Sequence, residues 1–197
     1  MRNEKTMKIV GLGLMTAVVV VLQLLGSFIH LGVFSITLVL APIIVGAALY
    51  GILGGAWLGL VFGVMVLLTD ASLFLAISVP GTVVTCLGKG ILAGVVAGAV
   101  YLALQKSNKL FAVILAGIAA PVTNTGCFLI GCLLFFKSTI VEWAGGESLG
   151  RFLIFGLVGM NFIVELLINM ILATVIVQII GIAAKGLSTG SAAKAKN

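Results

Sequence analysis

One lysine lies inside an apolar stretch of the chain, where a charged side chain is costly. Lys89 belongs to the segment 81–98, GTVVTCLGKGILAGVVAG, whose apolar character is typical of a membrane-spanning helix. A lysine at the bilayer centre costs roughly 2.5–3.5 kcal/mol on insertion scales, so such a residue is retained when it is paired or used. Lys89 is therefore the first candidate for a residue that binds a ligand.

Other polar side chains recur at helical spacing and could meet Lys89. At about 100° per residue, Thr85 falls on the same helix face as Lys89. In a later apolar segment, Asn161 and Glu165 share one face. Two interpretations of Lys89 and Glu165 stay open. They form an ion pair that lowers the cost of burying both charges, or they contact a ligand directly.

A third apolar segment contributes an amide and an aromatic ring. Pro121 cannot donate a hydrogen bond to the carbonyl of Gly117, so we expect a kink and a free backbone acceptor there. Asn124 lies one turn further on, on the face that also holds Phe128, and its amide bonds either a ligand or a neighbouring helix. The predicted substrate-binding residues are Thr85, Lys89, Asn124, Phe128, Asn161 and Glu165.

The composition predicts that the helices carrying these residues are embedded in a membrane. Of the 197 residues, 62% are hydrophobic and 8% are charged, with a mean hydropathy of +1.38, whereas about 25% of the residues of a soluble domain are charged. The predicted fold class is an all-α integral membrane protein, a compact bundle of six transmembrane helices in a single domain. The net charge of +6 comes from basic residues at the ends of apolar segments, so no nucleic-acid partner is expected.

Six helices are predicted, and they set the orientation of the chain. Their approximate bounds are 7–26, 36–49, 54–69, 81–104, 110–136 and 151–184, followed by a disordered basic tail at 185–197. An even number of crossings places both termini on one side, together with most of the basic residues, and the positive-inside rule makes that side the cytoplasm. The loops 27–35, 70–80 and 137–150 then face outward, where a site fed from outside would be built.

Regular glycines predict how the helices pack. Gly51, Gly55, Gly59 and Gly63 repeat every four residues into one helix, and Gly90, Gly94 and Gly98 do so in the next. Small residues at this spacing allow two helix backbones to approach closely. No strand precedes these glycines and no GKS/T signature follows them, which excludes a phosphate-binding loop.

The sequence lacks the residues that intramembrane enzymes need for catalysis. His30 is the single histidine, which excludes an HExxH metalloprotease, and the three cysteines have no metal-binding spacing. No nucleophile accompanies Lys89 and Glu165, and no Walker sequence is present, so ATP hydrolysis must come from partners. We predict a protein that is not an enzyme and that needs no metal or cofactor. A stand-alone ion-coupled carrier or channel is the alternative function.

The chain resembles the substrate-binding S-component of an energy-coupling factor (ECF) vitamin transporter. The resemblance covers nearly the whole chain. It rests on the six-helix size, on the opening KIVGLGLMTAVVVVLQLL, on SITLVLAPIIVGAALYGILGGAWLGLVFG and on PVTNTGCFLIG. It implies a subunit of the bacterial plasma membrane that captures a vitamin or related micronutrient outside the cell. The subunit then docks on a transmembrane coupling protein that two ATPase subunits drive.

The resemblance also implies where the substrate and the partner bind. In the family, the substrate site lies in the outer half of the membrane, lined by the fourth to sixth helices. An AxxxA motif on the first helix contacts the coupling protein, and here Gly13 and Ala17 match it with glycine in place of the first alanine. Lys89 and Arg151 indicate an anionic group, which makes pantothenate one candidate. Riboflavin, folate and thiamine-like ligands stay open, because Glu165 offsets that positive field.

Overall fold

Helices make up almost all of the structure, a computed structural model that describes residues 2–31 and 34–194. The long elements are α1 (Arg2–Gly26), α2 (Leu40–Tyr50), α3 (Ile52–Thr69), α5 (Val79–Leu104), α6 (Lys109–Phe135) and α9 (Gly159–Lys194). The short ones are α4 (Ser72–Ile77), α7 (Lys137–Ala144), α8 (Leu149–Arg151) and a π-helical segment η1 (Phe152–Val158). Strands β1 (His30–Leu31) and β2 (Phe34–Ser35) pair antiparallel, with His30 opposite Ser35.

The helices have the length and apolarity of a multi-pass membrane protein, which confirms the predicted all-α membrane class. Four helices within the described residues are long and apolar enough to cross a bilayer, in α1, α3, α5 and α6. A fifth crossing results if Leu149–Val158 and Asn161–Leu172, bent by 50°, form one span. Helix α2 has 11 residues, fewer than the roughly 20 that a straight crossing needs.

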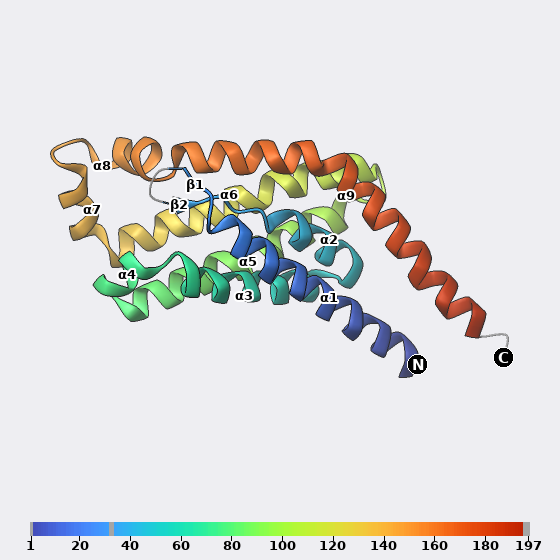
Figure 1. The fold of residues 1–197 in the computed structure, drawn as a ribbon. Helices are drawn as coiled ribbons and strands as arrows, with labels where there is room; N and C mark the ends of the chain where they lie inside the picture. The colour runs from blue at the N-terminus through green and yellow to red at the C-terminus, as the bar shows by residue number, and fades with distance from the viewer. Residues whose placement is uncertain (1, 32–33, 195–197) are drawn as a thin grey trace.

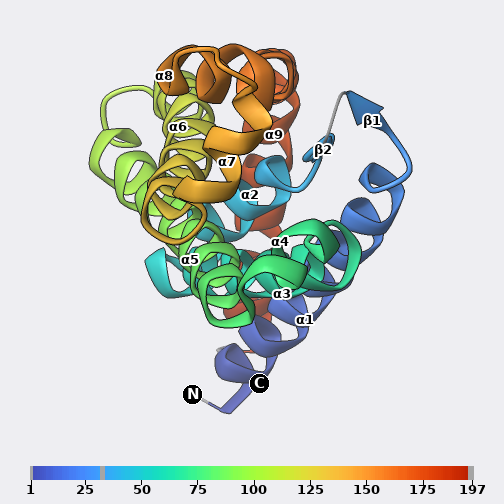
Figure 2. The same ribbon diagram turned by 90° about the vertical axis from the view of Figure 1, so that its left-hand side faces the viewer.

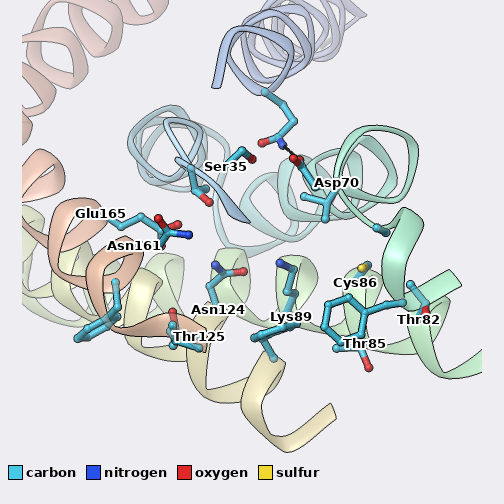
Figure 3. A pocket seen from close by; sticks show the side chains of 18 of the residues that line it. Ser35, Asp70, Thr82, Thr85, Cys86, Lys89, Asn124, Thr125, Asn161 and Glu165 are labelled. Carbon is cyan, nitrogen blue, oxygen red and sulfur yellow. Dashed lines mark hydrogen bonds between the residues drawn. The ribbon is translucent and has the colours of Figure 1, made fainter. Parts of the chain in front are cut away.

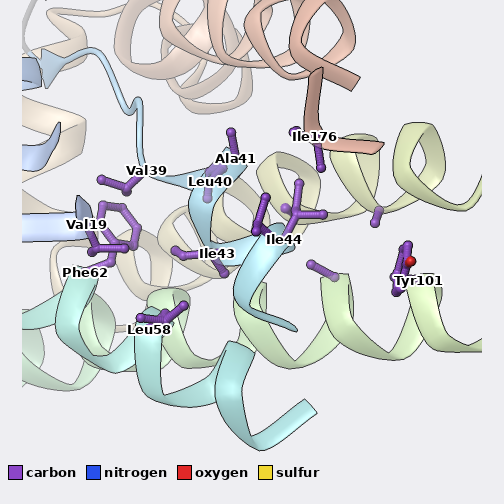
Figure 4. Close-up of a cluster of buried hydrophobic side chains, with 14 of the residues drawn as sticks. Val19, Val39, Leu40, Ala41, Ile43, Ile44, Leu58, Phe62, Tyr101 and Ile176 are labelled. Carbon is purple, nitrogen blue, oxygen red and sulfur yellow. The ribbon is translucent and has the colours of Figure 1, made fainter. Parts of the chain in front are cut away.

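Helix α2 lies at the centre of the bundle, surrounded by α1, α3, α5, α6 and α9 (Figure 2). Every residue from Leu40 to Ala47 is buried, which explains why this short helix is apolar on all sides rather than amphipathic. Its side chains meet Val19 of α1, Leu58 and Phe62 of α3 and Ile176 of α9 in one hydrophobic cluster (Figure 4). The surrounding helices therefore pack around α2, whose residues from Leu40 to Ala47 are all apolar and buried.

Glycines bring α3 and α5 into backbone contact, so the close approach that their spacing predicts is found between these two helices. A Cβ atom at Gly59 would overlap the carbonyl oxygen of Gly90, and one at Gly55 would overlap that of Gly94. A Cβ at Gly63 would lie 2.6 Å from the carbonyl oxygen of Cys86. Because real Cβ atoms do not approach this closely, only glycine permits this helix spacing. The contact holds the polar face of α5 in a fixed position beside α3.

Helix starts are stabilised by side-chain caps at both ends of the bundle. Ser78 accepts a hydrogen bond from the backbone N–H of Gly81 at the start of α5 (3.3 Å), and Asn108 accepts one from Phe111 at the start of α6 (3.2 Å). Helix α6 continues without a break through Pro121, where the sequence predicts a kink. The backbone carbonyl of Gly117 still lacks its usual helical partner, because Pro121 has no N–H to donate to it. This holds whether or not the axis of α6 bends at the proline.

Two segments expected as outer loops contain helices. Segment 70–80 holds α4, and segment 137–150 holds α7. Both lie at the end of the bundle opposite to the start of α1 and the end of α9 (Figure 1). Helix α9 continues to Lys194, beyond residue 184, where the sequence analysis ends the last helix. Residues 195–197 of the expected tail lie outside the described residues.

Candidate functional site

A pocket lies between α1, α3, α5, α6 and α9, toward the end that carries α4 and α7. It contains about 760 Å³ of space free of protein atoms, a volume that includes open solvent at its mouth. The side chains around it are Gln23, Ser35, Thr37, Val66, Asp70, Ala71, Phe74, Thr82, Thr85, Cys86, Lys89, Asn124, Thr125, Phe128, Phe136, Val158, Asn161, Phe162 and Glu165. Polar and aromatic side chains therefore line one cavity, and Figure 3 shows the polar ones on several helices around it.

The structure brings all six predicted substrate-binding residues to this pocket. They are Thr85, Lys89, Asn124, Phe128, Asn161 and Glu165, and three different helices carry them. The arrangement follows from the helical spacing, which gives each helix one polar face toward the cavity (Figure 3). Arg151 does not join them, because it is exposed and does not line the pocket.

Lys89 is held between two aromatic rings rather than by a carboxylate. Its Nζ lies 5.6 Å from the ring centroid of Phe62 and 5.4 Å from that of Phe128, both within the range of a cation–π interaction. Among the described residues, no ion pair joins Lys89 to Glu165. The direct Lys89–Glu165 ion pair, one of the two sequence-based interpretations, is therefore wrong for this structure.

Glu165 is anchored on the other side of the same cavity. Its carboxylate lies near the side chain and the backbone of Thr37, and it interacts with Lys89 through the electrostatic field. The next turn of α9 supports it, because Asn169 Nδ2 donates to the Glu165 backbone oxygen at 2.8 Å. Glu165 is 5% exposed. A buried carboxylate and a lysine thus face one cavity from two helices without neutralising each other by contact.

Several buried polar atoms at the pocket have no hydrogen-bond partner among the described residues. These are Gln23 Oε1, Thr85 Oγ1, Asn124 Oδ1 and Glu165 Oε2. Buried polar atoms in proteins are nearly always paired, so a group of orphaned atoms around one cavity indicates a bound ligand or ordered water. All four accept hydrogen bonds, and only the Thr85 hydroxyl also donates. The cavity is therefore suited to a molecule with several hydrogen-bond donors.

Aromatic side chains surround the outer end of the pocket. The ring of Phe74 in α4 makes edge contacts with Phe128, Phe136 and Trp143, at centroid distances of 5.7, 4.9 and 5.8 Å. Phe135 of α6, by contrast, is 43% exposed. These contacts join α4 and α7 to α6, so the helices found in the expected loops pack against the rings at the site.

Sequence reasoning missed the pocket residues that come from the first half of the chain. Gln23 of α1, Thr37 of the segment before α2 and Asp70 after α3 all line the cavity. Gln23 is a single polar residue in an apolar run and Asp70 ends another, and this polarity is the signal that could have identified them. Within the described residues, no three His, Cys, Asp or Glu side chains gather as metal ligands.

The two residues predicted to meet a partner lie on the outside of the bundle. Gly13 and Ala17 of α1 are exposed, and a Cβ atom at Gly13 would meet no atom within 4 Å. Large apolar residues on the same helix are also exposed, among them Val10 (66%) and Leu14 (63%). Since α1 buries Val19 and Gln23 on its other face, this surface is free to contact lipid or another protein.

Comparisons with known proteins match this chain to transporters. Residues 7–181 match the family described as ECF transporter, substrate-specific component. The chain is 30% identical over 195 residues to the pantothenic acid transporter PanT of Lactococcus lactis subsp. cremoris (strain MG1363), an alignment that covers 90% of this chain and 95% of that protein. No solved structure matches the chain.

Proposed function

Because the chain belongs to the family of ECF transporter substrate-specific components, we propose that it binds pantothenate in this pocket as the capture subunit of a vitamin importer. The family is one of transporters and not of enzymes. The similarity to a pantothenic acid transporter supports this vitamin over riboflavin, folate and thiamine-like ligands. Family membership also favours the capture subunit over a stand-alone carrier or channel.

The observation that carries the choice of ligand is the environment of Lys89. Its ammonium group is partly buried at the pocket and lies over Phe62 and Phe128, with no ion-pairing carboxylate among the described residues. A partly buried cation is stabilised strongly when it donates a charge-assisted hydrogen bond to a group of opposite charge. The carboxylate of pantothenate supplies that charge, and Lys89 is the residue that we propose to bind it.

The remaining groups of pantothenate fit the orphaned acceptors. The vitamin carries an amide N–H in its middle and hydroxyl groups at the end opposite to its carboxylate. Asn124 Oδ1 and Glu165 Oε2 are buried and have no hydrogen-bond partner among the described residues, so each can accept from such a donor. We propose that the molecule lies across the cavity with its carboxylate at Lys89 and its donors toward Asn124, Asn161 and Glu165. Thr85 and Phe128 complete the walls.

The transport role requires an orientation and partners. We propose six crossings, of which α2 is the short one, with both termini in the cytoplasm and α4 and α7 on the extracellular side of a bacterial plasma membrane. The lysines at both ends of the chain and in the α5–α6 turn support this orientation. Gly13 and Ala17 are the proposed contact with a transmembrane coupling protein, which two ATPase subunits drive.

Ligand identification tests this function directly. The protein is purified from cells grown with excess vitamins, and the ligand that it retains is identified by mass spectrometry. Emptied protein is then titrated calorimetrically with pantothenate, riboflavin, folate and thiamine. We expect pantothenate to be retained and to bind most tightly. Retention of another vitamin, with no heat from pantothenate, would overturn the proposed substrate.

A further inference from the structure

We infer that Gln23 of α1 is a specificity-determining residue, whose side-chain oxygen accepts a hydrogen bond from a hydroxyl or amide N–H of the substrate, and that Asp70 fixes it in this orientation. The inference rests on the proposed function and adds a fourth helix to the substrate contacts. Gln23 is 1% exposed and lines the pocket. It therefore lies where a ligand in the cavity can reach it.

The orientation of the Gln23 amide follows from its hydrogen bonds. Its Nε2 donates to Asp70 Oδ2 at 2.8 Å and lies 3.4 Å from Thr69 Oγ1, and Figure 3 draws the bond to Asp70 as a dashed line. Turning the amide over would set its oxygen against the Asp70 carboxylate, two acceptors with no proton between them. The nitrogen therefore stays at Asp70, and the oxygen stays on the opposite edge of the amide.

Asp70 is itself held in place. Its Oδ2 also accepts a hydrogen bond from the Thr69 hydroxyl at 2.6 Å, a short distance typical of a hydroxyl bound to a carboxylate. Asp70 follows α3 directly. The carboxylate at the end of α3 thus positions the amide of α1, and its own role toward the ligand is indirect.

The opposite edge of the amide is the part that a ligand can use. Gln23 Oε1 is buried and has no hydrogen-bond partner among the described residues. An unpaired buried oxygen of this kind is destabilising until it accepts a hydrogen bond. Because the amide nitrogen is committed to Asp70, the group is a pure acceptor toward the pocket. It favours substrates with a donor at this position and disfavours those with a carbonyl or carboxylate there.

The test compares pantothenate with two analogues that each lack one kind of donor. In the dideoxy analogue, hydrogen replaces both hydroxyls; in the ester analogue, oxygen replaces the amide N–H. Affinities are measured by calorimetry on the purified full-length chain. Gln23→Met keeps the length of the side chain and removes its hydrogen bonds. Gln178→Met, at an exposed position of α9, is the matched control.

We expect Gln23→Met to weaken pantothenate binding about tenfold, the loss usual for one neutral hydrogen bond, and Gln178→Met to leave it unchanged. The deficit should vanish for whichever analogue lacks the donor that Gln23 binds, and persist for the other. Unchanged pantothenate affinity in Gln23→Met, or a deficit that persists for both analogues, would overturn the inference alone. Failure of the wild-type chain to bind pantothenate would overturn the proposed function and this inference together.

Asp70→Asn provides a second variant that keeps the shape of the site. An asparagine can donate as well as accept, so the Gln23 amide is free to turn and present its N–H₂ group to the pocket. We expect weaker binding of pantothenate and unchanged binding of the analogue that lacks the relevant donor. A structural defect would weaken both ligands equally, and that result would contradict the positioning role. This variant decides the question if Gln23→Met does not fold.

Discussion

Lys89 and Glu165 line one pocket from α5 and α9 without forming an ion pair in the described part of the chain. Lys89 lies over two phenyl rings, and the Glu165 carboxylate lies near Thr37. If the two charges were in contact, an ion pair between them would be enough to explain why both are kept inside the membrane. Their separation leaves a cation and an anion available to different parts of one ligand, and the predictions for Glu165 and Lys89 follow from it.

Glu165→Gln keeps the shape of the side chain and removes its charge. We expect pantothenate to bind about 10- to 100-fold more weakly, because hydrogen bonds to a charged acceptor contribute about 1.5–3 kcal/mol. Calorimetry on purified protein measures the change. Glu142→Gln, at an exposed position of α7, is the control and should bind as the wild type does. Equal affinity in both variants would remove Glu165 from the site.

Asn124→Leu replaces a buried amide by an apolar group of similar size. The loss of one neutral hydrogen bond predicts about tenfold weaker binding. Asn108→Leu makes the same substitution at the cap of α6. It should lower the melting temperature through the lost cap, a loss of about 1 kcal/mol, while affinity stays unchanged. Normal affinity in Asn124→Leu would mean that this amide serves helix packing instead.

Gly13→Leu and Ala17→Leu test the proposed docking face of α1. Both positions are exposed, so the variants should bind pantothenate as the isolated wild-type subunit does. A leucine prevents the close helix approach that small residues allow, so vitamin uptake by cells that express the complete transporter should be lost. Gly181→Leu on α9, where a Cβ also meets no atom within 4 Å, should transport normally. Full uptake in the α1 variants would place the docking face elsewhere.

Gly59→Ala tests the contact between α3 and α5. The added methyl group would overlap the Gly90 carbonyl, so the helices must separate, and we expect a loss of about 1–3 kcal/mol in stability, as for other overpacked positions. Gly88→Ala is the matched control on α5, because its Cβ would meet no atom within 4 Å. Thermal unfolding followed by circular dichroism in detergent compares them. Equal melting temperatures would contradict the tight packing.

The sequence predicts the elements whose signals are local. Apolar runs about as long as a bilayer crossing identify α1, α3, α5 and α6, and glycines every four residues indicate which helix faces can pack closely. Helical spacing also places Lys89, Asn124 and Glu165 on faces that can converge. These features depend on one helix at a time, so the order of residue types is enough to infer them.

The features that the sequence does not predict depend on how separate helices meet. No pattern shows that the short α2 lies at the centre, because its uniform apolarity is equally compatible with a lipid-facing segment. The cation–π contacts of Lys89 join α5 to Phe62 of α3 and Phe128 of α6. Gln23 and Asp70, on α1 and after α3, become neighbours only in the folded bundle. Such contacts require the three-dimensional arrangement.

We propose that Lys89 binds the carboxylate of pantothenate, and pantothenol, in which an alcohol replaces that carboxylate, isolates this one contact. Calorimetric titration of the wild type and of Lys89→Met with both ligands gives one double comparison. We predict that the wild type prefers pantothenate by about 10- to 100-fold, the contribution of a charge-assisted hydrogen bond, and that Lys89→Met loses this preference. Equal binding of both ligands by the wild type, or a preference that Lys89→Met retains, would contradict the claim.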